Sequence, residues 1–306
     1  MNRSSKREIV VNCFYPSYQE LKYLSFESEY ALKHAIENHV WTMVYRDFSY
    51  RTLTPKTEKE GRISIDQFRK KCIAFLSRNY YQYFTAETLS YCKYDDLDTW
   101  IACNSFEDWH EKMCESLLKL INERYKDKEE QTGKYVTVTY GKAQKIVNML
   151  FKYLYCFDYA EGYIAKFAPC HMTIDAIIID WVADIVLPSL QDVNIPIKHS
   201  NTVKWSKSFA KGSKDEAYTY LWYQNIIQKF LELNYLDQDG NPLTPLVAEF
   251  YAWPEEQWYK ATREWLSLDV NQQHYPNYFD GYIDENLKKI AACAEKRRAK
   301  VASNAG

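Results

Sequence analysis

The residue types that could do chemistry gather in one stretch of this chain, residues 140–181. Lys145, Met149 and Lys152 stand at i, i+4 and i+7, so on a helix two amines and an apolar side chain share one stripe. Asp175 lies further along, at the start of another strongly apolar helix. A lysine nucleophile and a carboxylate at the mouth of a helix pair can attack a sugar carbon and leave an imine. Lys145 and Asp175 are therefore the candidate catalytic pair.

This stretch resembles the core of the helix-hairpin-helix DNA glycosylases, which place a lysine just past a glycine-containing hairpin and an aspartate at the head of the next helix. It is similar in particular to the archaeal 8-oxoguanine DNA glycosylase branch. There a base-pocket lysine follows the catalytic lysine, and an acid and a tryptophan stand further along. The likeness covers roughly residues 135–265, and it rests here on Lys145, Lys152, Asp175, Glu249 and Trp253.

The resemblance implies an activity and a set of site residues. A modified base would be flipped out of DNA, and its N-glycosidic bond would be cleaved to leave an abasic site. Lys145 and Asp175 would be the catalytic residues, with a water molecule in place of the lysine as the other possible nucleophile. The residues expected to bind the extruded base are Met149, Lys152, Glu249 and Trp253.

The resemblance also implies the fold. It would be all-α and helix-hairpin-helix DNA glycosylase-like, with two helical lobes around a cleft. Residues 1–134 would form an N-terminal helical lobe, and residues 135–306 a hairpin-containing catalytic lobe with C-terminal helices; one continuous domain is the alternative. Only 8 Gly and 9 Pro in 306 residues agree with a mainly helical chain, because few residues break helices.

Two departures from the family pattern leave choices open. The hairpin has only Gly141, and Lys142 beside it is a rival nucleophile to Lys145. The interval 176–248 is also longer than the archaeal enzymes lead us to expect, which suggests a different lid over a different base. The base is therefore either an oxidised purine or a bulky modified cytosine, such as the glucosylated hydroxymethylcytosine of phage DNA. The second choice would make the protein an antiviral glycosylase.

Helical periodicity and capping signals place the elements. Ser105 is expected to cap a helix, Pro254 to stand in the first turn of another, and Val136 to Tyr140 to form a short strand or one arm of the hairpin. The expected helices cover residues 28–46, 65–83, 105–126, 142–156, 174–187, 215–234, 254–267 and 284–301.

Positive charge is local in this chain, whose formal net charge is −2. The segment 198–214 carries five lysines and no acidic residue, which is typical either of a solvated loop or of a surface that contacts phosphates. We expect double-stranded DNA containing a modified base as the partner, bound by a monomer. The expected contacts to the DNA backbone are Gly141, Lys142, Lys204, Lys207 and Lys211.

Each site residue also has a purely structural interpretation. Lys145 and Lys152 could face solvent on an amphipathic helix, and Asp175 could serve as a helix N-cap. Trp253 at a helix entry could belong to the core. Glu249, among apolar and aromatic neighbours, needs a partner in any interpretation.

The remaining features predict no metal and no cofactor. The eight cysteines are scattered and form no CxxC pair, which indicates reduced core residues; the lone Cys293 excludes a four-cysteine iron–sulfur cluster near the C-terminus. We find no signal peptide or membrane span and expect a soluble, cytoplasmic protein. From another class, the alternative function is a non-catalytic helical module that binds nucleic acid or protein.

Overall fold

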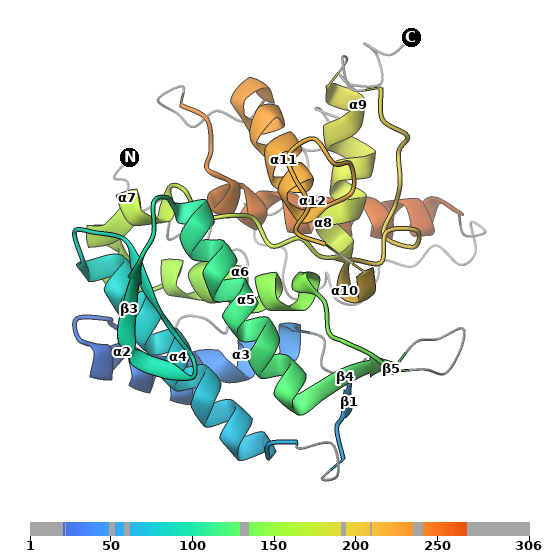
Figure 1. Cartoon of the computed structure of the whole chain (residues 1–306). Helices are drawn as coiled ribbons and strands as arrows, with labels where there is room; N and C mark the ends of the chain where they lie inside the picture. Colours follow the sequence, from blue (N-terminus) through green and yellow to red (C-terminus); the bar gives the residue numbers. More distant parts are fainter. Residues whose placement is uncertain are drawn as a thin grey trace.

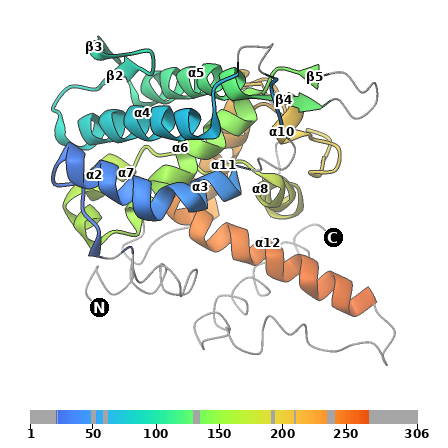
Figure 2. The same ribbon diagram turned by 90° about the horizontal axis from the view of Figure 1, so that it is seen from below.

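The computed structural model describes residues 21, 23–48, 53–57, 62–128, 135–190, 194–208, 210–234 and 241–267. Over these ranges the protein is mostly helical, as the sequence predicts, with short strands in two small sheets. Figure 1 shows the helices packed around α6, and Figure 2 shows α12 extending away from the rest. Within the described ranges, no helix combines the length and apolar character that crossing a membrane needs.

Three of the helices described before residue 135 begin at serine caps. Ser28, Ser64 and Ser105 each accept a hydrogen bond from a backbone N–H in the first turn of the helix that follows. The Ser105 cap was predicted, whereas the complete capping box of Ser64 with Gln67 was not. The helical elements are α2 (Glu29–Ala35), the π-helical η2 (Ile36–Val40), α3 (Trp41–Asp47), α4 (Ile65–Thr85) and α5 (Phe106–Arg124).

The two sheets are small and antiparallel. In the first, β1 (Leu53–Pro55), β4 (Tyr125–Lys128) and β5 (Tyr135–Val136) lie in the order β1-β4-β5. The second is the hairpin of β2 (Ser90–Lys93) and β3 (Asp96–Ala102). The strand predicted over 136–140 is thus limited to its first residue, because the chain already turns into a helix at Tyr140.

The helix that carries the candidate lysines, α6 (Tyr140–Tyr155), lies at the centre of the molecule. All sixteen of its residues are buried, since α3, α5 and α10 pack against it. One cluster of buried hydrophobic side chains runs from Leu21 to Ala252 and includes residues of both expected lobes. The division at residue 134 remains a prediction.

The remaining elements bring α12 against α8. Pro254 was expected in the first turn of a helix, but α12 begins at Pro245 and Pro254 lies inside it. The true first turn has its own signals, Pro245 and the Thr244 hydroxyl, which accepts from the N–H of Val247. The helix expected over 284–301 lies outside the described residues. The elements are η5 (Asp158–Tyr163), α7 (Ile164–Phe167), α8 (Ala176–Trp181), η6 (Val182–Val186), α9 (Leu187–Ser189), α10 (Trp205–Ser208), α11 (Tyr220–Asn234) and α12 (Pro245–Ser267).

Candidate active site

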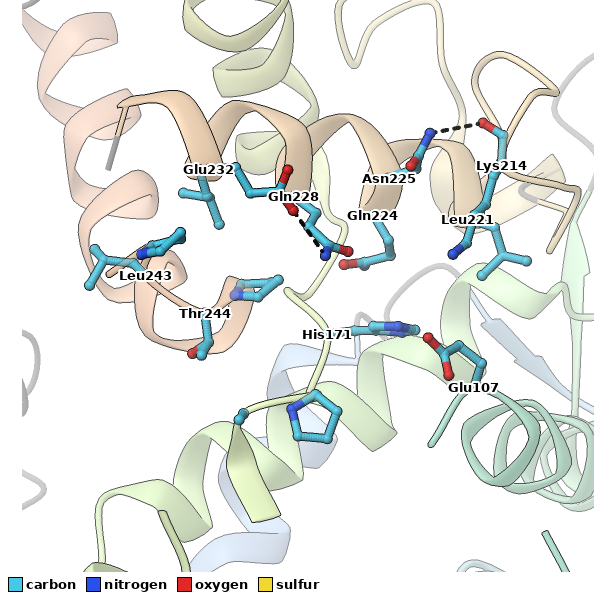
Figure 3. A pocket seen from close by; sticks show the side chains of 15 residues that line it. Glu107, His171, Lys214, Leu221, Gln224, Asn225, Gln228, Glu232, Leu243 and Thr244 are labelled. Carbon is cyan, nitrogen blue, oxygen red and sulfur yellow. Dashed lines mark hydrogen bonds between the residues drawn. The ribbon is translucent and has the colours of Figure 1, made fainter. Parts of the chain in front are cut away.

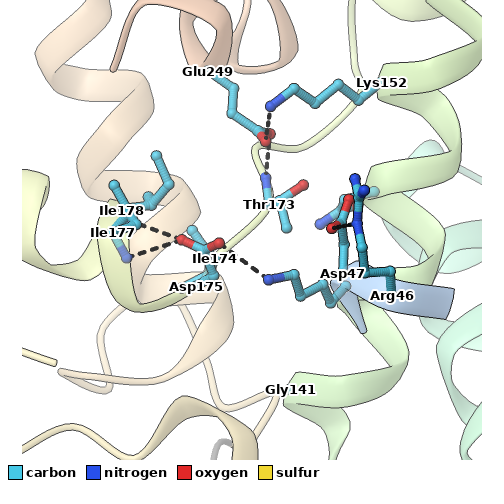
Figure 4. A network of polar contacts seen from close by, with 12 residues as sticks. Arg46, Asp47, Gly141, Lys152, Thr173, Ile174, Asp175, Ile177, Ile178 and Glu249 are labelled. Carbon is cyan, nitrogen blue, oxygen red and sulfur yellow. Dashed lines mark hydrogen bonds and ion pairs between the residues drawn. The ribbon is translucent and has the colours of Figure 1, made fainter. Parts of the chain in front are cut away.

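Lys145 of α6 and Asp175 at the start of α8 form an ion pair. The Lys145 Nζ lies 3.1 Å from Asp175 Oδ2, and the two side chains are 10% and 14% exposed (Figure 4). The other carboxylate oxygen accepts hydrogen bonds from the backbone N–H groups of Ile177 and Ile178, at 3.0 and 3.2 Å. Asp175 is therefore both the predicted N-cap and the partner of the predicted lysine. The cap fixes the carboxylate while one oxygen faces the amine.

Trp205 completes the surroundings of this pair. Its ring centroid lies 5.0 Å from Lys145 Nζ, within the range of a cation–π contact. Thr139 joins α10 to the start of α6 through a hydrogen bond from its hydroxyl to the carbonyl of Ser206. We did not predict Trp205 as a site residue, and its position between the lysines of the segment 198–214 was the only sequence signal.

The second predicted pair, Lys152 with Glu249, is more deeply buried. Lys152 Nζ lies 2.8 Å from Glu249 Oε1, and both side chains are at most 3% exposed. Glu249 Oε2 accepts the backbone N–H of Thr173 at 2.7 Å, so both carboxylate oxygens are engaged. The partner expected for Glu249 is thus Lys152. The alternative that Lys145 and Lys152 face solvent is wrong.

Side-chain amides hold the chain segment that leads to Asp175. Gln144 donates to the carbonyl of Ile174 at 2.8 Å and accepts its N–H, and Gln224 does the same for Met172. Asn148 donates to the carbonyl of Met172 at 3.2 Å. These bonds satisfy buried backbone groups that no neighbouring strand could satisfy. Gln144 and Asn148 were missed, although they lie four residues apart in the same helix as the candidate lysines.

Two expected contacts to the DNA backbone require correction. Gly141 is the second residue of α6 and is buried, so it does not form an exposed hairpin turn. Lys142 is fully buried, with Nζ 6.0 Å from the ring centroid of Phe48. Neither residue can reach a phosphate in this conformation, because the helix starts earlier than the predicted 142 and turns both toward the core.

The other expected contacts lie at different depths. Lys204 is exposed, Lys211 forms an ion pair with Glu111, and the Lys207 side chain lies outside the described residues. Met149 is buried, and Trp253 is partly buried against the hydrophobic core. Of the residues expected at the DNA backbone, Lys204 and Lys211 are therefore compatible with that role, and Lys207 stays a prediction.

Comparison with known proteins finds no match to a family model, to a curated protein or to a solved structure. In the part of the chain that the structure describes, no three His, Cys, Asp or Glu side chains come together to hold a metal ion. Any function must therefore be argued from the geometry of the side chains themselves.

A buried network of hydrogen bonds links two histidines behind this site. The hydroxyl of Tyr220 lies 2.8 Å from His171 Nδ1 and 3.2 Å from His110 Nε2, and His110 Nε2 lies 2.9 Å from Asn148 Oδ1. Burial lowers the pKa of both imidazoles; for His171, with the charge of Lys214 as a lesser cause, it falls to about 3. Both rings are therefore neutral at neutral pH.

These histidines make the fold sensitive to acid. In the unfolded chain each binds a proton near pH 6.5, while in the folded protein each stays neutral to a much lower pH. The stability they contribute is thus complete above about pH 6.5 and is lost as the pH falls below that value, toward about 3 in the case of His171, by up to about 1.4 kcal/mol per pH unit for each histidine. We expect urea unfolding between about pH 7 and about pH 5 to show this loss, and His171→Gln to make it shallower. A stability that is flat or rises on acidification over that window would contradict the assignment.

Proposed function

We propose that this protein is a DNA glycosylase that flips a modified base out of duplex DNA and cleaves its N-glycosidic bond. The observation that carries the proposal is the Lys145 amine 3.1 Å from the Asp175 carboxylate, at a position that is mostly but not wholly buried. An amine with an adjacent proton acceptor is what nucleophilic attack on a sugar carbon requires. If the pair served only to stabilise the fold, two apolar side chains of similar size would serve equally well.

The chemistry follows from the roles of the two groups. Asp175 takes a proton from Lys145, whose nitrogen then forms a bond to C1′ while the bond from C1′ to the base breaks. The base leaves with the bonding electrons and is protonated. Opening of the sugar ring, with a proton passing from nitrogen to O4′, gives an imine between Lys145 and C1′. In its alternative role, Asp175 keeps its negative charge and stabilises the positive charge that develops on the sugar in the transition state.

Residues around the pair divide into two roles in this proposal. Met149 and Trp253 offer an apolar side chain and an aromatic ring to the extruded base. Lys152 and Glu249 satisfy each other, and Glu249 also holds Thr173, so we assign them to positioning the segment before Asp175. Lys152 or Glu249 could hydrogen-bond to the edge of a base only if the Lys152–Glu249 ion pair or the Glu249–Thr173 hydrogen bond were broken.

Binding of the DNA backbone is assigned to the lysine segment. Lys204 is exposed and lies next to Trp205, which contacts Lys145. Lys211 is within reach of solvent but is paired with Glu111, so a phosphate would have to compete with that carboxylate. Such contacts position the protein on DNA and do not read the base.

Release of free bases tests the proposal. The protein is incubated with genomic DNA, with DNA containing oxidised purines and with phage DNA containing glucosylated hydroxymethylcytosine, and the filtrate is analysed by mass spectrometry. We expect one modified base to be released by the wild type and not by Lys145→Gln. Binding to these DNAs without release of any base would favour the non-catalytic module instead.

A further inference from the structure

A cavity of about 360 Å³ lies on the other side of the segment that leads to Asp175. It is bounded by the start of α5, residues 168–171, α11 and the start of α12 (Figure 3). Leucine and proline side chains form most of its apolar surface, and none of the described residues that line it is Phe, Tyr or Trp. Its polar groups include Glu107, His171, Lys214, Gln228, Glu232 and Thr244.

His171 and Gln224 are the buried polar residues of this cavity among those the structure describes, and the Gln224 amide already donates to and accepts from the backbone of Met172. The His171 side chain lines the cavity, yet the residue is only 9% exposed. Nδ1 is engaged by Tyr220, and in the described part of the chain no hydrogen-bond partner occupies Nε2. A ring nitrogen that is buried from bulk solvent and opens onto a cavity is a group that a ligand can satisfy.

The hydrogen-bond network determines which nitrogen of His171 carries the proton. Asn148 Nδ2 has only two hydrogens, and they are assigned to its two nearest acceptors, Gln144 Oε1 and the Tyr220 hydroxyl, since the carbonyl of Met172 already accepts from Gln224 at 2.7 Å. Asn148 Oδ1 is then an acceptor, and His110 Nε2 must donate to it. Tyr220 accepts from Asn148 Nδ2 at 2.9 Å, and its own proton is then directed to His171 Nδ1. His171 therefore keeps its proton on Nε2 and presents an N–H donor to the cavity.

The chemistry of the lining selects the ligand. The N–H of His171 requires an acceptor, whereas the carboxylates of Glu107 and Glu232 can accept further donors besides the Gln228 amide, which donates to Glu232 at 3.3 Å. Two carboxylates against the one amine of Lys214 disfavour an anion. The absence of Phe, Tyr and Trp from the described lining disfavours a stacked base. We propose that this cavity binds a neutral, hydroxyl-rich molecule of monosaccharide size, whose hydroxyl groups both donate and accept.

Two sources could present such a group, a free monosaccharide or a sugar carried on a modified base. His171 and Asp175 lie four residues apart on one segment, so their Cα atoms are at most about 14 Å apart. At this separation, a sugar carried on a base is the source that would connect the cavity with the candidate active site. The sugar site itself does not depend on the glycosylase activity.

Titration with methyl glucosides tests the inference, with inorganic phosphate and adenine as comparison probes. We expect saturable binding of a glucoside, observed as a shift of the His171 Nε2–H signal in ¹⁵N-edited spectra. Gln228→Ala and Glu232→Gln change exposed lining residues of α11 and should weaken this binding about tenfold or more. Lys229→Ala, an exposed residue of the same helix outside the lining, should leave it unchanged. No glucoside binding, equal binding by all variants, or preference for phosphate or adenine would overturn the inference.

A second comparison identifies the source of the sugar. If the sugar is carried on a base, Glu232→Gln should weaken binding to DNA with glucosylated hydroxymethylcytosine and leave binding to the unglucosylated DNA unchanged. If the ligand is a free sugar, Glu232→Gln should bind both DNAs as tightly as the wild type does. Its binding of the glucoside should still be weakened. Lys145→Gln should retain glucoside binding in either case, which separates a failure of the sugar site from a failure of base excision.

Discussion

Asp175→Asn should reduce base release by about 10²- to 10³-fold and leave the protein folded. Asparagine retains a carbonyl oxygen, so the hydrogen bonds from Ile177 and Ile178 that begin α8 can be kept. The change removes the negative charge that faces Lys145 Nζ at 3.1 Å. Either role of Asp175 is lost, because the lysine has no proton acceptor, or the developing charge on the sugar has no stabilising partner. Single-turnover release of the base, measured beside a thermal unfolding curve, gives both quantities.

Asp184→Asn is the matched control for this change. Asp184 lies in the helical continuation of α8, is largely buried and faces His199 at 3.7 Å instead of a lysine of α6. It should leave base release within a factor of about two. Wild-type release by Asp175→Asn would remove Asp175 from the mechanism, and an equal loss by both variants would trace the effect to packing.

Breaking the Lys152–Glu249 pair from one side should have the largest effect on stability. Lys152→Met leaves the Glu249 carboxylate buried without its counter-charge, which we expect to cost about 3–5 kcal/mol of the free energy of unfolding. The double variant Lys152→Met with Glu249→Gln should recover much of this loss, because a neutral amide can still accept the N–H of Thr173. Urea unfolding of the wild type, the two single variants and the double variant measures the coupling between the two residues.

The pair would not have the role assigned to it if the single change cost less than about 1 kcal/mol, the value typical of an exposed ion pair. The assigned role would also be contradicted if the loss of unfolding free energy in the double variant equalled the sum of the losses in the two single variants. Lys33→Met, at an exposed residue of α2, is a control for the general loss of a lysine. It should change stability by no more than about 0.5 kcal/mol.

The elements of this fold that local sequence determines were predictable. The helix over residues 65–83 and the serine cap at residue 105 follow from periodicity and from side-chain hydrogen bonds within one turn. Asp175 was predicted to begin a helix for the same reason. The link between Asp175 and Lys145 came from the resemblance to a family, since thirty residues separate them.

The depth of α6 could not be predicted, because it depends on distant parts of the chain. Its lysines suggested a helix with one face in solvent, yet the whole helix is buried. Lys152 can be buried only because Glu249, 97 residues further along, supplies its counter-charge. The amides of Gln144, Asn148 and Gln224 likewise have partners in an extended segment that has no local signal. Long-range partners of this kind decide where a polar side chain lies, and no window of sequence contains them.

Borohydride trapping with the DNA that releases a base tests the central claim most directly, namely that Lys145 is a nucleophile activated by Asp175. Hydride reduces an imine between the lysine and C1′ to a stable amine, so the wild type should give a covalent protein–DNA adduct. Lys145→Gln should give none, whereas Lys142→Gln should retain it wherever that variant folds, because Lys142 is fully buried beside Phe48 while Lys145 pairs with Asp175. An adduct that persists in Lys145→Gln, or base release by the wild type with no adduct at all, would contradict the claim.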